Sequence, residues 1–178
     1  MPEPPSVKKF YVIGDYYVGK SNLIQALLKP FMKMKCISYN LNDMITIYKV
    51  KEAAMEYEIY DIKCNHLHFN YYCSEIARSA DLVLMVYDIG YIETIQICKK
   101  YIDVMAEVFN TYKPIIFVGN KIDQVNINRN QIESTLKQIL ASNNLNYDIT
   151  HHITVSSING KNIKTLRELM LKKSKLRN

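Results

Sequence analysis

Hydrophobic residues along the chain alternate between short, nearly unbroken runs and stripes at helical spacing. Leu82 to Tyr87 and Pro114 to Val118 are such runs, typical of strands that are buried on both faces of a parallel sheet. Ile92 to Phe109 instead carries apolar residues three and four positions apart, the spacing of an amphipathic helix. The same criteria predict strands over 8–13, 45–50, 55–60 and 152–155, and helices over 22–28, 71–80, 132–140 and 163–170.

Strands that alternate with helices indicate an α/β fold with a mostly parallel sheet, because right-handed crossovers place helices on both faces. The predicted strands at 45–50 and 55–60 are close enough in sequence to pair as a hairpin. Residues 29–43 show no clean period, and we expect a loop there. In such a sheet ligands bind beyond the carboxyl ends of the strands, so the candidate chemistry should collect at strand ends.

Length and composition favour one cytoplasmic domain. The chain has 178 residues, of which 48% are hydrophobic and 22% are charged, which is enough for one well-packed core. No apolar run approaches the roughly 18 residues of a membrane span, and the N-terminus lacks the basic start and apolar core of a signal peptide. We expect a single domain over 1–178, with a flexible N-terminus at 1–7 and a basic C-terminal tail at 172–178.

Charge and cysteine content change this picture little. The net charge of +6 is modest, although the tail is locally basic. A solvated helix end explains such a tail, because cations suit the carboxyl end of a helix; contact with acidic lipid or a partner is the alternative. Cys36, Cys64, Cys73 and Cys98 show no CxxC pairing and no secretory context, so reduced thiols are expected.

The clearest motif is Gly14-Asp15-Tyr16-Tyr17-Val18-Gly19-Lys20-Ser21, in which two glycines precede Lys and Ser at the spacing of a phosphate-binding loop. It joins a predicted strand to a predicted helix, the context that the motif needs. The glycines let successive amides point at phosphate oxygens in front of a helix N-terminus. Lys20 is expected to reach the β- and γ-phosphates, and the Ser21 hydroxyl to bind Mg²⁺. A simple glycine turn before a basic helix start is the alternative.

A second motif, Gly119-Asn120-Lys121-Ile122-Asp123, follows a predicted buried strand. A carboxylate three residues after an Asn can accept two hydrogen bonds, from the N1–H and 2-amino groups of guanine. Adenine lacks this pair of donors, so the wrong base would leave polar groups of the site unpaired. The motif is a weak signal alone, but about a hundred residues after a phosphate loop it predicts a guanine site.

Together these motifs resemble those of small GTPases of the Ras superfamily, closest in pattern to the Rab branch, over residues 8–172. The resemblance implies the P-loop NTPase fold, a mostly parallel six-stranded sheet with helices on both faces. It also implies GTP or GDP and Mg²⁺ as ligands, with Asp61 as the Mg²⁺-associated aspartate and Val155 to Gly160 as the loop that touches guanine O6. The residues implied in nucleotide binding are Gly14, Asp15, Tyr16, Tyr17, Val18, Gly19, Lys20, Ser21, Asn22, Asn120, Lys121, Asp123, Ser156, Ser157 and Ile158; those implied in metal binding are Ser21 and Asp61.

Several positions depart from the family pattern. Tyr16 and Tyr17 stand where the family has small residues near the γ-phosphate, so two rings are expected to crowd the cradle. Tyr39 replaces the threonine that binds Mg²⁺ and the γ-phosphate, and Cys64 replaces the glycine whose amide senses that phosphate. Asn65 replaces the glutamine that orients the attacking water, and its side chain is one methylene shorter. We therefore assign no catalytic residue and expect weak or absent GTP hydrolysis.

The resemblance implies a molecular switch in vesicle or intracellular transport. A catalytically inactive adaptor or scaffold is the alternative, and a P-loop kinase or ATPase, against which Asn120 to Asp123 argues, is the third possibility. Effector or regulatory proteins are expected to bind residues 36–44 and 62–73, and no nucleic-acid partner is expected. The protein is expected to be cytoplasmic. No cysteine follows Cys98 for lipidation, which leaves two alternatives: peripheral association with intracellular membranes through a partner or the basic tail, or a natural C-terminus that extends beyond residue 178.

Two weaker patterns complete the candidates. Cys64, His66, His68 and Cys73 are metal-ligand types close together in sequence, but their spacing fits no zinc pattern. We interpret them as unrelated residues of a mobile loop. Phe31 lies near the end of the first predicted helix, from which it could cover the guanine face or simply pack against the core.

Overall fold

The computed structural model describes residues 7–31, 37–42, 44–52, 55–108, 114–124, 129–141 and 152–174. Within these ranges seven strands form one sheet, in the order β2-β3-β4-β1-β5-β6-β7. The elements in chain order are β1 (Lys8–Ile13), α1 (Lys20–Leu28), the 3-10 helix η1 (Lys29–Phe31), β2 (Ile37–Asn42), β3 (Ile45–Glu52), β4 (Met55–Ile62), α2 (Asn70–Ser79), β5 (Leu82–Asp88), α3 (Ile92–Val108), β6 (Ile115–Asn120), α4 (Arg129–Ala141), β7 (His152–Thr154) and α5 (Ile163–Ser174).

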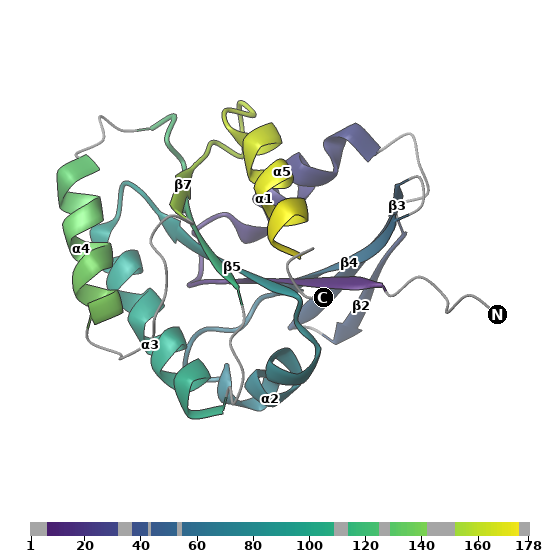
Figure 1. The fold of residues 1–178 in the computed structure, drawn as a ribbon, viewed down its shortest axis with the longest axis horizontal. Coiled ribbons are helices and arrows are strands. Elements are labelled where there is room, and N and C mark those ends of the chain that lie inside the picture. The colour runs from purple at the N-terminus through teal and green to yellow at the C-terminus, as the bar shows by residue number, and fades with distance from the viewer. Residues whose placement is uncertain are drawn as a thin grey trace.

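The sheet is the central layer of the molecule (Figure 1). β1 lies between β4 and β5 and is parallel to both, and β6 and β7 extend the parallel part beyond β5. β2, β3 and β4 form an antiparallel meander on the other side of β1. Because β1, β5 and β6 run in the same direction, their carboxyl ends reach the same edge of the sheet. The loops that carry both sequence motifs begin at that edge, after Ile13 and Asn120.

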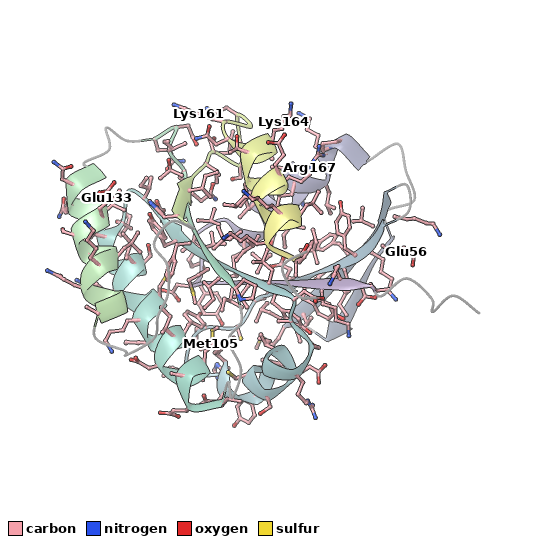
Figure 2. The ribbon with its side chains drawn as sticks, viewed as in Figure 1. Glu56, Met105, Glu133, Lys161, Lys164 and Arg167 are labelled. Carbon is pink, nitrogen blue, oxygen red and sulfur yellow. The ribbon has the colours of Figure 1, made fainter. Side chains whose placement is uncertain are left out.

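Helices cover both faces of the sheet, with α1 and α5 on one face and α2, α3 and α4 on the other (Figure 1). Alternate residues of β1 enter different cores: Phe10 and Val12 pack under α1 and α5, whereas Tyr11 and Ile13 pack under the other three helices. Figure 2 shows side chains filling the space on both faces of the sheet, among them the buried Met105 of α3.

The α/β fold class is confirmed, and every strand and helix expected from the sequence is present. One expectation is wrong: the stretch 29–43 contains η1 and an additional edge strand, β2, where a loop was expected. β2 pairs with β3 from Ile37 opposite Lys49 to Asn42 opposite Ile45, so it makes the sheet seven-stranded. The physical reason is the neighbouring hairpin, since the free edge of β3 offers backbone groups to the strand before it.

The described cysteines agree with the expectation of reduced thiols. Cys64, Cys73 and Cys98 are free and buried, and Cys36 lies outside the described residues. The last turn of α5 carries Lys172 and Lys173, the start of the expected basic tail. None of the described helices combines the length and the apolar character that crossing a membrane requires.

Candidate functional site

The phosphate-loop motif forms a tight turn between the end of β1 and the start of α1. Gly14 and Gly19 have φ angles of 149° and 91°, a region that disfavours residues with a Cβ. A Cβ at position 14 would collide with the carbonyl of Val86 on β5, and a Cβ at position 19 would lie 2.5 Å from the side-chain nitrogen of Asn120 on β6. Glycine at these two positions therefore lets the loop pass close to Val86 of β5 and Asn120 of β6.

Lys20 turns its side chain back into this loop. Its Nζ donates hydrogen bonds to the carbonyls of Gly14 at 2.8 Å and Asp15 at 2.7 Å, and the residue is only 7% exposed. Burial lowers the pKa of the Lys20 ammonium, while the carboxylates of Asp61 and Asp15 oppose that shift. An ammonium has three donors, so two bonds to the loop leave one for a phosphate oxygen.

Ser21 and Asp61 form a pair that fits a divalent cation. The Ser21 hydroxyl donates to Asp61 Oδ2 at 2.6 Å across the gap between α1 and β4. Asp61 is fully buried, and its Oδ1 has no hydrogen-bond partner. A buried carboxylate oxygen left unpaired is costly, and Mg²⁺ prefers oxygen ligands of this kind, directly or through its bound waters. The Ser21 hydroxyl and the Asp61 carboxylate would hold such an ion next to the phosphate loop.

A hollow of about 380 Å³ lies over the phosphate loop. Tyr16 and Tyr17 stand on its rim, with ring centroids 6.3 Å apart, and are 44% and 93% exposed. The expectation that two rings crowd the cradle is therefore wrong for Tyr17, whose positive φ of 62° accompanies a ring in solvent. The hollow is lined by Tyr16, Tyr17, Gly19, Lys20, Ser21, Asn22 and Lys63.

Asn120 is a fully buried connector between three segments. Its side-chain nitrogen donates to the carbonyl of Val18 in the phosphate loop at 3.0 Å. Its side-chain oxygen accepts a hydrogen bond from the backbone amide of Ser157 at 3.1 Å. The phosphate loop, the end of β6 and the loop at 156–160 are thus held together through one side chain.

The rest of the second motif lies around this connector. Lys121 has a φ of 69°, and its ammonium forms an ion pair with Asp88 at 2.7 Å. Asp123 is exposed in the turn that follows β6. Ser156 is buried, whereas Ile158 is largely exposed. A second hollow of about 380 Å³ shares Asn22 with the first, and is lined by Asn22, Gln25, Ala26, Lys29, Ser157, Ile158, Asn159 and Gly160.

The segment after β4 holds Asn65 in a local turn. Asn65 Oδ1 accepts hydrogen bonds from the backbone amides of Leu67 at 3.1 Å and His68 at 3.2 Å, and lies 3.0 Å from His68 Nδ1. The side chain therefore caps the turn that leads into α2. Neighbouring Cys64 is buried, which raises the pKa of its thiol to about 11.

Tyr101 of α3 connects this segment to the phosphate loop. Its fully buried hydroxyl lies 3.1 Å from the carbonyl of Gly14 and 3.3 Å from the carbonyl of Cys64. Its ring packs edge-on against Phe69 at 5.0 Å and His66 at 6.2 Å. Burial raises the pKa of Tyr101, so the hydroxyl keeps its proton and donates it to one of these carbonyls.

Comparison with known proteins places this geometry in a family. A model of the Ras family matches residues 9–175. The chain belongs to the Ras family of small GTPases. GTP-binding protein yptV5 of Volvox carteri is 26% identical over 141 residues, which cover 76% of this chain and 68% of that protein. Membership of a family of GTP-binding proteins supports guanine-nucleotide binding by this chain.

A solved structure agrees with this Ras-family fold. Translation elongation factor SelB of Methanococcus maripaludis, in complex with the GTP analogue GppNHp, matches with a TM-score of 0.68 and 21% identity. The match covers 95% of this chain and 34% of that one, so the chain spans about a third of the elongation factor. This likeness shows the fold alone.

In this Ras-family chain the sequence-predicted residues collect at one edge of the sheet. The phosphate loop, Asn22 and Lys20 lie around the first hollow, and Ser157 and Ile158 around the second. Their roles in nucleotide and metal binding stay predictions. The side chains of Phe31 and Tyr39, and all of Cys36, lie outside the described residues.

The four candidate zinc ligands have other partners or surroundings. Cys73 Sγ donates to the carbonyl of Val104 at 3.8 Å, and the ring of His68 faces Asn65. Among the described residues no group of three or more Cys, His, Asp and Glu is placed to hold a metal ion.

Sequence reasoning missed three residues that shape the site. Tyr101 was assigned only to the apolar stripe of a helix, since nothing in that pattern reports a hydroxyl that reaches a loop. Asp88 follows a buried strand, as site residues do in parallel sheets, and that position could have indicated it. Lys63 lies two residues after the predicted metal ligand Asp61, and this proximity was the available signal.

Proposed function

We propose that this chain is a Rab-like switch that binds GTP and GDP with Mg²⁺ in vesicle or intracellular transport and hydrolyses GTP weakly or not at all. The proposal of binding rests on the tight turn that Gly14 and Gly19 allow, the Lys20 ammonium with one of its three donors still available, and the Ser21–Asp61 pair. When bound, Mg²⁺ would neutralise phosphate charge beside these residues.

The observation that carries the hydrolysis part is the turn around Asn65. Its side-chain oxygen, which would have to face an attacking water, already accepts hydrogen bonds from Leu67 and His68. Releasing it would leave the Leu67 amide without this partner, and the His68 amide with only its 3.3 Å hydrogen bond to the Asn65 carbonyl. The side chain is also one methylene shorter than the family's glutamine. Both effects argue against a water held in line with the γ-phosphate.

A catalytically inactive adaptor is the second candidate. The contact of the buried Tyr101 hydroxyl with the carbonyls of Gly14 and Cys64 favours it. In the family the residue at position 64 reports the γ-phosphate by moving its amide. A Cys64 peptide held from behind by α3 would move less between nucleotide states, and a ligand shifts a conformation only through differential contacts.

Partners and location belong to the same proposal. Effector or regulatory proteins would bind residues 36–44 and 62–73, and the exposed side chains of Leu67 and Tyr71 support the second of these surfaces. The protein would be cytoplasmic and peripheral on membranes, with Lys172 and Lys173 of α5 as part of the contact. Fractionation of cells that express tagged protein, with and without both lysines changed to Gln, tests this location.

Two measurements test the central proposal. A competition titration should show GTP and GDP binding far more tightly than ATP, and equal affinities would contradict a guanine site. Single-turnover hydrolysis should run at or below the order of 10⁻⁴ per second that intact relatives show alone. The variant Asn65→Ala should leave this rate unchanged, because the parent amide is bound within its own turn. A faster parent rate that Asn65→Ala abolishes would show that Asn65 positions the water.

A further inference from the structure

We infer that Lys63 is a second cation of the nucleotide site, which binds the terminal phosphate of the triphosphate and makes the chain prefer GTP over GDP. This inference rests on the guanine-nucleotide function proposed above. The family pattern places no lysine in this role, and Lys63 is distinct from Lys20, the lysine of the phosphate-loop motif.

The position of Lys63 is the first argument. Its side chain lines the hollow over the phosphate loop together with Lys20 and Ser21. Lys63 belongs to the segment that follows β4, whereas Lys20 begins α1 and its Nζ donates to the carbonyl of Gly14. Tyr16, at the loop position nearest the γ-phosphate in the family, lines the same hollow. A phosphate group in this hollow would therefore meet cations from two segments of the chain that are far apart in sequence.

The backbone around Lys63 is held on both sides, which is the second argument. The Lys63 amide donates to the carbonyl of Met44 at 2.8 Å. One residue later, the carbonyl of Cys64 lies 3.3 Å from the buried hydroxyl of Tyr101, whose ring packs on Phe69. The side chain therefore leaves a fixed stretch of backbone, and less conformational entropy is lost when it binds an anion.

Charge supplies the third argument. In the part of the chain that the structure describes, no carboxylate lies within ion-pair distance of Lys63 Nζ. Lys121, at the same edge of the sheet, is by contrast neutralised by Asp88 at 2.7 Å. The Asp61 carboxylate nearest in sequence is occupied on one oxygen by Ser21. An ammonium that lines the hollow over the phosphate loop and has no carboxylate partner among the described residues attracts the most highly charged ligand that fits.

The test compares the affinities of GDP and of a non-hydrolysable GTP analogue for the parent and for Lys63→Gln. Removing one partly exposed charge contact should weaken the analogue about tenfold while GDP changes less than about twofold. Lys63→Arg should restore most of the loss, because it keeps the charge. A higher salt concentration should reduce the difference in affinity for the GTP analogue between the parent and Lys63→Gln, since screening weakens the contact between charges. The matched control is Lys164→Gln on the outer side of α5 (Figure 2), which should change neither affinity.

A second variant tests the positioning argument. Tyr101→Phe keeps the ring against Phe69 and removes the hydroxyl that faces the carbonyls of Cys64 and Gly14. A shared effect through Gly14 would weaken GDP equally, so the ratio of the two affinities is the readout. The variant should weaken the analogue relative to GDP by about threefold, less than loss of the charge itself. An unchanged ratio of the two affinities in Lys63→Gln overturns the inference while nucleotide binding stands. If the parent binds neither guanine nucleotide, the proposed function fails first and the inference falls with it.

Discussion

Replacing Asn120 with Ala should destabilise the protein even without a nucleotide. In the parent its side chain donates to the Val18 carbonyl at 3.0 Å and accepts from the Ser157 amide at 3.1 Å, and it is fully buried. The variant would leave both backbone groups without a partner. A buried group left unpaired costs about 1 to 3 kcal/mol, and the bond to the Ser157 amide is only partly buried, so that amide takes the lower end, about 1 kcal/mol. We therefore expect the free energy of unfolding to fall by about 2 to 4 kcal/mol.

Urea unfolding of nucleotide-free protein, followed by far-UV circular dichroism, measures this change. Nucleotide must be removed because any ligand of the folded state raises apparent stability. With a slope of about 2 kcal/mol per molar urea, the midpoint should fall by about 1 to 2 M. Asp123→Asn is the matched control, since Asp123 belongs to the same motif but is exposed, and its midpoint should not move. An Asn120→Ala midpoint within about 0.3 M of the parent would refute the reasoning.

Three further outcomes are expected. Lys20→Ala should weaken GDP binding at least about tenfold, measured by fluorescence titration, because a charge-assisted contact is lost; unchanged binding would make the loop a structural turn only. Asp123→Asn should shift base preference from guanine toward xanthine in a competition titration. A retained preference for guanine would show that other residues recognise the base. His152 lies 2.6 Å from the Tyr87 hydroxyl, and burial lowers its pKa from the ordinary value of 6.5. Below that value the unfolded state takes up a proton that the folded state resists, so stability should fall between pH 7.5 and 5.5, and fall less in His152→Gln.

The hydrophobic pattern predicted most of the fold because buried strands and amphipathic helices differ in period. β5 is an unbroken apolar run because both of its faces are buried, whereas α3 has an apolar stripe because only one of its faces is buried. β2 was missed although Ile37, Tyr39 and Leu41 alternate with polar residues. Its pairing depends on the free edge of β3, a contact between segments that no local window contains.

The candidate site was predictable where backbone geometry demands one residue type, as at Gly14 and Gly19. It was not predictable where a side chain acts at long range in sequence. Tyr101 reaches Gly14 across 87 positions, and Asn120 reaches Val18 across 102. For Tyr17 the sequence shows a large ring next to the phosphates, but it does not show the positive φ that accompanies the exposure of this ring to solvent.

The missing Cβ of Gly19 has a consequence for mutational coupling. The Asn120 amide nitrogen occupies the space 2.5 Å from where that Cβ would stand, and from there it reaches Val18. A residue with a side chain at 19 would push Asn120 away and break the connection to Ser157 as well. The effects of substitutions at positions 19 and 120 are therefore expected to be non-additive. Substitutions at the exposed Asp123 can change base preference without disturbing this connection. A chimera with the phosphate loop of another protein, by contrast, also needs the residue at position 120 that matches that loop.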